Sequence, residues 1–170
     1  QSNIPSRPHC STGSFKGRQE GLEDHVCDLL SPGAAASSCV VATERIAECV
    51  GTEWPGAGLI RDEIMTMELQ EHPEPPELDS AWSAWKKKLA ETKGNEWVKD
   101  MRKLKERRAQ AIALMWGQCS DSARSKMENK DEHCNACKSV DLMALLKLIQ
   151  GVTCQFQDDR KQSLSILESK

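Results

Sequence analysis

The sequence predicts an all-α protein in which several helices pack around one long central helix. Two observations predict this class. Apolar residues recur near every 3.6 residues in several segments, whereas no stretch alternates polar and apolar residues for long enough to form a convincing strand. Good helix formers such as Ala, Leu, Met, Glu and Lys dominate residues 97–127, and no proline interrupts them.

Residues 109–119 form the longest apolar segment, and we expect them to be the centre of the core. An apolar stripe at helical spacing includes Trp97, Met101, Leu104, Ala111, Met115 and Cys119. From 109 to 116 the apolar residues surround the whole helix, so we expect other helices to enclose it. A break is expected at Gly117 or Ser120-Asp121, where Ser120 or Asp121 can cap a short continuation to Met127.

The chain before the central helix divides into an arm and a helical section. Residues 1–14 are polar, contain two prolines and are expected to be a flexible arm. In the N-terminal section, 15–71, a short ordered segment has helical spacing at Leu22, Val26 and Leu29. Helices are expected over about 38–50, ended by Gly51, and over 59–69.

A proline-rich connector, 72–77, separates this section from a C-terminal section, 78–170. Whether the two sections are separate helical subdomains or parts of one fold stays open. Ser80 is expected to cap a helix whose apolar face holds Trp82, Trp85 and Leu89, with an interruption at Gly94-Asn95.

Beyond the central helix, residues 129–138 are polar and are expected to form a loop. Ser139 is expected to cap the next helix, which Gly151 ends, and a last helix follows. The chain begins with Gln1 rather than Met, and its last helical stretch stops at Lys170 without a cap. We therefore expect an excised fragment, truncated at its C-terminus.

The composition indicates either a helical domain with much solvent-facing surface or one whose core a partner completes. Hydrophobic residues make up 38% of the chain and aromatic residues 4%. The net charge of −3 gives no overall argument for nucleic acid. The sequence shows no signal peptide and no apolar run of about 18 residues, so we expect a cytoplasmic protein with no membrane contact and with its eight cysteines reduced.

A metal centre is not expected, although His133, Cys134 and Cys137 resemble one half of a zinc site. Two further ligands are lacking, and the adjacent His133 and Cys134 cannot easily hold one ion. We prefer an ordinary loop with two thiols, with zinc or redox chemistry as alternatives, and expect no cofactor. No nucleophile elbow, phosphate-binding loop or zinc-protease motif is found. We therefore expect neither catalysis nor a small-molecule substrate.

Residues 86–108 are strongly basic, with ten Lys or Arg and four Asp or Glu, a net charge of +6. With Trp82, Trp85 and Trp97 they could contact phosphates and stack on bases. A solvated helix face is the alternative interpretation, and we prefer it. The candidate nucleic-acid contacts are Lys86, Lys87, Lys88, Lys99, Arg102, Lys103, Arg107 and Arg108.

Four segments, taken in order, resemble the Gag-like polyproteins of copia-type LTR retrotransposons, particularly those of algae and diatoms. They are Phe15-Lys-Gly17 with Leu22, His25 and Asp28; residues 43–51; Trp116-Gly117-Gln118-Cys119 with Arg124; and Leu145, Leu146 and Ile149 with Phe156. The chain departs from the family in lacking Tyr and in having Cys27 and Cys49 where aromatic residues are usual.

The resemblance implies a capsid-like helical protein that associates with copies of itself into virus-like particles packaging retroelement RNA. The alternative is a helical RNA-binding module that uses residues 86–108 without assembling a shell. The family's nucleic-acid-binding zinc knuckle has a different spacing from that of His133–Cys137.

Overall fold

The computed structural model describes residues 15–29, 35–130 and 141–168, with side chains in the last helix described as far as Gln155. The described residues form five helices and no strand: α1 (Ala35–Glu53), α2 (Gly58–Thr66), α3 (Ala84–Gly117), α4 (Asp121–Glu128) and α6 (Leu142–Glu168). The predicted all-α class is confirmed.

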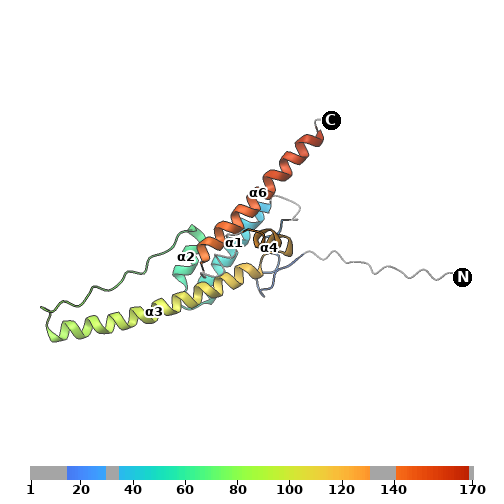
Figure 1. Cartoon of the computed structure of the whole chain (residues 1–170). Helices are drawn as coiled ribbons and strands as arrows, with labels where there is room; N and C mark the ends of the chain where they lie inside the picture. Colours follow the sequence, from blue (N-terminus) through green and yellow to red (C-terminus); the bar gives the residue numbers. More distant parts are fainter. Residues whose placement is uncertain (1–14, 30–34, 131–140, 169–170) are drawn as a thin grey trace.

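One hydrophobic core joins the two sections of the chain. Helices α1, α2, α4 and α6 pack with the C-terminal part of α3 (Figure 1). The core draws Ile46 from α1, Ile60 from α2, Met115 from α3, Met127 from α4 and Leu145 from α6, all nearly inaccessible to solvent. The predicted apolar faces of the helices near 38–50 and 59–69 are therefore the faces that the core uses.

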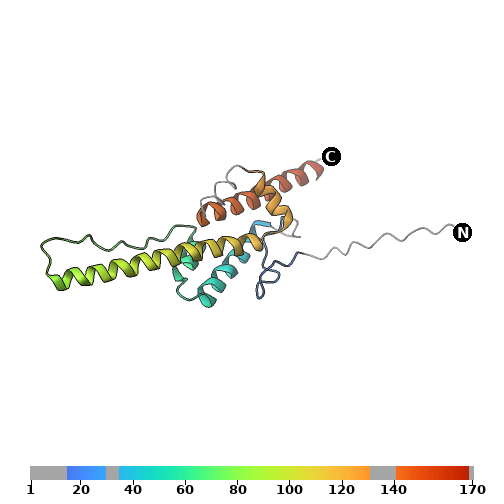
Figure 2. The ribbon, with the colours of Figure 1, turned by 60° about the horizontal axis from the view of Figure 1, so that its bottom comes forward.

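The N-terminal part of α3 extends beyond this core as an arm. Helix α3 has 34 residues, which makes it about 50 Å long. Its first buried residue is Leu104, and Met101 packs against the core one turn earlier, so residues 84–100 reach about 25 Å past the core. Residues 67–83 run outward from α2 beside the arm to the start of α3 (Figures 1 and 2). Along this path the indole nitrogen of Trp97 donates a hydrogen bond to the carbonyl oxygen of His72 (3.3 Å).

The expected start and interruption of this helix were wrong. Ser83, rather than Ser80, caps α3, and its hydroxyl accepts a hydrogen bond from the Lys86 amide (3.3 Å). The helix continues through Gly94-Asn95, because one glycine costs a helix only about 1 kcal/mol relative to alanine. The expected apolar face is also not buried, since Trp85 is 76% exposed and Leu89 42% exposed.

The centre of α3 is only partly enclosed. Ala111 and Met115 of the predicted stripe are buried, as is Leu114 outside it, but Ala109 and Ala113 are exposed. The expectation of a helix surrounded on all sides was wrong because alanine is both apolar and a strong helix former. It therefore occurs on solvent-facing positions without cost.

At the C-terminal end of α3 the predicted break is confirmed. The helix stops at Gly117, and the Ser120 hydroxyl caps α4 by accepting a hydrogen bond from the Ala123 amide (3.3 Å). Three residues, Gln118, Cys119 and Ser120, lie between α3 and α4. This turn positions the junction described below.

Helix α6 corrects another expected boundary. It passes through Gly151, which was expected to end it, because buried Val152 and Thr153 continue its core-facing side. The Asp141 carboxylate accepts a hydrogen bond from the Ala144 amide (3.0 Å) at its start. The expected Ser139 cap, the loop with His133, Cys134 and Cys137, and the arm 1–14 lie outside the described residues.

The segment 15–29 is ordered but not helical, contrary to the spacing of Leu22, Val26 and Leu29. Leu22 and Leu29 are buried, yet the backbone makes turns between them. Gly21 and Asp24 have φ values of +84° and +69°, which a right-handed helix cannot accommodate. Apolar spacing alone could not reveal these turns.

Candidate functional site

The best-defined polar site is a junction between the segment 15–29 and the turn after α3, centred on Gln118. Its buried side-chain amide makes four hydrogen bonds to the backbone of that segment. The oxygen accepts from the amides of Arg18 (2.8 Å) and Gln19 (3.1 Å), and the nitrogen donates to the carbonyls of Leu22 (2.9 Å) and His25 (3.0 Å). One side chain therefore fixes the path of the chain's opening segment.

Gly17 lies directly against this amide. It has a φ of +87°, and a Cβ built on it would stand 2.4 Å from the Gln118 amide nitrogen. Only glycine satisfies both the backbone conformation and the contact. Gly17 belongs to the first of the four family-like segments and Gln118 to the third, so the fold brings residues of two of these segments into contact.

Arg124 closes the C-terminal end of α3 from the first turn of α4. Its guanidinium donates to the carbonyl oxygens of Trp116 (3.1 Å) and Gly117 (3.3 Å). It also lies 5.9 Å from the centre of the Phe15 ring and 5.8 Å from that of Trp116. A cation at this place satisfies carbonyls that the ending helix leaves free and suits the negative end of its dipole.

Three thiols lie in the core beneath the junction: Cys27, Cys39 and Cys119. The Cys27 amide donates to the Gln118 carbonyl (2.9 Å), and the Ser120 amide donates to the Cys27 carbonyl (3.0 Å). Hydrogen bonds with the Cys119 and Cys39 thiols, together with burial, hold the pKa of Cys27 well above its usual range. Within the described residues, no group of His, Cys, Asp and Glu is arranged to hold a metal ion.

We expect Cys27 to react with iodoacetamide at least about tenfold more slowly than the exposed Cys154. The thiolate is the reactive form, and the raised pKa keeps buried Cys27 protonated at neutral and mildly alkaline pH. Peptide mapping by mass spectrometry over a time course measures both rates. Equal labelling of Cys27 and Cys154 in the folded protein would contradict the burial of this thiol cluster.

The residues predicted to contact nucleic acid do not form one uniform surface. Lys88, Lys99, Arg102 and Lys103 are exposed on α3. Lys86 is exposed with its ammonium 4.4 Å from the centre of the Trp82 ring, while Lys87 is half-buried. Arg107 is half-buried and its guanidinium lies 5.7 Å from the centre of the Trp54 ring.

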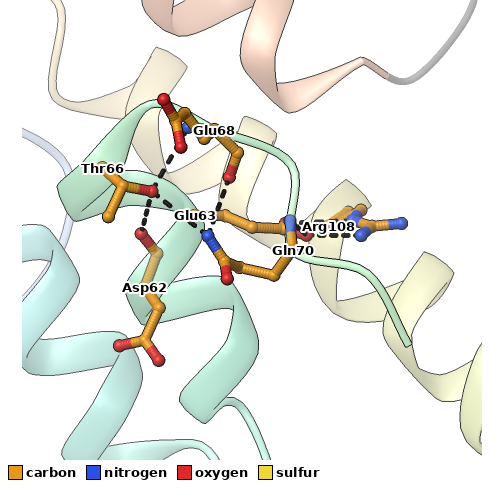
Figure 3. A network of polar contacts seen from close by, with 6 residues as sticks. All are labelled: Asp62, Glu63, Thr66, Glu68, Gln70 and Arg108. Atoms are coloured by element: carbon orange, nitrogen blue, oxygen red, sulfur yellow. Dashed lines mark hydrogen bonds and ion pairs between the residues drawn. The ribbon is translucent and has the colours of Figure 1, made fainter. Parts of the chain in front are cut away.

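Arg108 is not available to phosphate because it pairs with Glu63 of α2 (Figure 3). Its guanidinium binds both carboxylate oxygens, with a distance of 3.0 Å from Nε to Oε2. Glu63 is fully inaccessible to solvent and also accepts a hydrogen bond from the Gln70 amide (3.2 Å). This pair joins α2 to α3 at the base of the arm.

An acidic segment accompanies the basic arm, which the sequence analysis did not anticipate. Residues 67–83 carry five acidic residues and no Lys or Arg: Glu68, Glu71, Glu74, Glu77 and Asp79. Because this segment runs beside the arm (Figures 1 and 2), its net charge of −5 opposes the +6 of residues 86–108. The field around the arm is therefore less positive than the helix alone suggests.

An apolar groove of about 240 Å³ lies where α1, α2 and α6 meet. Its lining includes Val40, Met65, Leu146 and Ile149, with Glu44 among the polar residues. Leu145 and Ile149 of the family motif are core residues, whereas the side chain of Phe156 lies beyond those described. Since the groove residues come from three separate helices, no local sequence pattern reveals it.

No protein family, curated protein or solved structure matches this chain. None of the described helices has the length and apolar character needed to cross a bilayer. The resemblance to Gag-like polyproteins therefore depends on the ordered motif segments of the sequence.

Proposed function

We propose that this chain is a Gag-like, capsid-type structural protein of the cytoplasm, which associates with copies of itself into particles that package retroelement RNA. The observation that carries this proposal is the set of large apolar side chains left exposed on the described residues. They are Val40, Val41, Met65, Leu69, Leu78, Trp85, Leu89 and Val98. Exposed apolar side chains that form a contiguous patch are commonly buried by association with another molecule, whereas exposed apolar residues that stand singly are ordinary on a protein surface.

The junction adds a second argument. The resemblance depends on motifs about 100 residues apart, and residues from two of them, Gly17 and Gln118, are in direct contact. Arg124, a third motif residue, holds the same turn. Sequence features that resemble one family and form one structural unit favour a shared origin over chance similarity.

Self-association is tested by light scattering and negative-stain microscopy across protein and salt concentrations. We expect the average mass to rise with concentration and regular particles or oligomers to form. A strictly monomeric species at high concentration in every buffer would contradict the proposal.

The second candidate is an RNA-binding module, and the exposed basic residues of the arm favour it. Reversing the charges of Lys88, Lys99, Arg102 and Lys103 to Glu should then weaken RNA binding at least about tenfold at 0.1 M salt. It should also flatten the dependence of affinity on salt, because each lost phosphate contact removes about 0.7 from the log–log slope for a single strand.

The matched control reverses four exposed basic residues on the body: Lys16, Arg18, Lys126 and Lys147. Fluorescence anisotropy with a labelled single-stranded RNA measures both proteins. If the two variants lose affinity equally, or neither loses it, the arm is not the RNA-binding surface.

A further inference from the structure

We propose that the tip of the arm, residues 82–89, of one copy docks into the groove between α1, α2 and α6 of a second copy. This inference rests on the proposed self-association and specifies the two surfaces that make the contact. Because the surfaces differ, the contact is head-to-tail.

The tip presents an apolar anchor surrounded by positive charge. Trp85 and Leu89 are four residues apart on one side of α3 and are 76% and 42% exposed. The three residues between them, Lys86, Lys87 and Lys88, are all basic. Exposed tryptophan is the residue type that most often dominates binding energy in protein interfaces.

The groove is suited to receive side chains. Its volume of about 240 Å³ is below the roughly 300–1,000 Å³ that is usual for small-molecule pockets. Val40 and Met65 at its edge are 57% and 53% exposed, which leaves apolar surface for a partner to cover. The apolar side chains of a tryptophan and a leucine from another helix match this apolar lining.

The charges of the two surfaces are complementary. Helices α1 and α2 contain five acidic and two basic residues. Leaving out Glu63, which pairs with Arg108, their net charge is −2, and Glu44 lies at the groove itself. Outside residues 67–108, which form the basic arm and the acidic segment beside it, the chain has 13 basic and 17 acidic residues, a net charge of −4. The basic tip is therefore attracted to the body of another copy.

A tip cannot reach the groove of its own chain. It stands about 30 Å beyond Leu104 along a continuous helix, whereas the groove belongs to the body (Figures 1 and 2). The contact therefore joins different molecules. Such a contact between unlike surfaces produces a closed ring or an open filament, depending on the rotation between neighbouring copies.

The test uses one variant of each surface and a matched control for each. The tip variant is Trp85→Glu and its control is Val98→Glu, a change at an exposed α3 residue outside the tip. The groove variant is Val40→Lys and its control is Val41→Lys. These two valines are neighbours of similar exposure, 57% and 48%, but only Val40 lines the groove. Thermal melts followed by circular dichroism verify that all four are folded.

Sedimentation velocity measures association of each protein and of the two variants mixed. We expect Trp85→Glu and Val40→Lys each to weaken self-association at least about tenfold, while both controls assemble like the unmodified chain. Mixed together, the two variants should form a 1:1 dimer and nothing larger, because one intact tip meets one intact groove. Only a head-to-tail contact restores association in this way.

Two results would overturn the inference. If the unmodified chain assembles and either surface variant assembles equally well, this contact is wrong while the proposed self-association stands. If both variants fail but their mixture forms no dimer, the interface is not head-to-tail between these surfaces. An unmodified chain that stays monomeric at every concentration would instead contradict the proposed function and this contact with it.

Discussion

Replacing Arg108 with alanine is expected to lower the free energy of unfolding by about 3–5 kcal/mol. The change leaves the Glu63 carboxylate, which is fully inaccessible to solvent, without its cationic partner in the core. An uncompensated buried charge costs far more than a missing surface contact. Urea denaturation followed by circular dichroism measures the loss.

Two further variants separate the charge effect from packing. Arg45→Ala removes the cation of an exposed pair with Glu48, whose side chains are 56% and 61% exposed, and should cost at most about 1 kcal/mol. The double change of Glu63 and Arg108 to methionine should recover most of the stability, because it removes both charges together. If Arg108→Ala costs no more than Arg45→Ala, the pair does not join α2 to α3.

The second large effect is expected at Gln118. Replacing Gln118 with alanine removes four hydrogen bonds. The amides of Arg18 and Gln19 and the carbonyl of His25 lose this partner, while the Leu22 carbonyl keeps the hydrogen bond that the His25 amide donates to it. We expect a loss of about 2–4 kcal/mol, since unsatisfied buried polar groups cost more than the average hydrogen bond contributes. Hydrogen exchange should accelerate at residues 18–28, which Gln118 and the turn after α3 hold in place.

Gln118→Glu tests the chemistry of this junction while keeping the shape. A carboxylate can accept hydrogen bonds from Arg18 and Gln19, but it cannot donate to the carbonyls of Leu22 and His25. We therefore expect destabilisation as large as that of the alanine variant. Gln110→Ala, at an exposed glutamine of α3, should be nearly neutral. A stable Gln118→Glu protein would contradict the assigned orientation of the amide.

The sequence predicted the core-facing positions better than the ends of the helices. The stripe through Leu104, Ala111 and Met115 and the Ser120 cap are as predicted, because periodicity and capping are properties of the local chain. The local pattern predicts helix ends at Gly51 and Gly151 and an interruption at Gly94, yet all three glycines lie inside helices. A glycine inside a helix costs about 1 kcal/mol, which packing elsewhere along the helix easily offsets.

The candidate sites depended more strongly on tertiary structure. The Gln118 junction joins residues 93–100 positions apart, and the Arg108–Glu63 pair joins residues 45 apart. The sequence placed Arg108 among the exposed basic residues because no local feature marks it as the one that turns inward. The acidic residues of 67–83 can likewise be read from the sequence, but the sequence does not show that this segment lies beside the basic arm and partly compensates its charge.

The sequence alone determined the all-α class, the apolar faces of α1 and α2 and the concentration of positive charge in residues 86–108, since each follows from local composition and period. Only the tertiary structure decided that α3 leaves the core as an arm, that Gln118 and Arg124 hold the opening segment, and that α1, α2 and α6 form a groove. These features arise from contacts between residues distant in the chain, whose geometry depends on how whole helices pack.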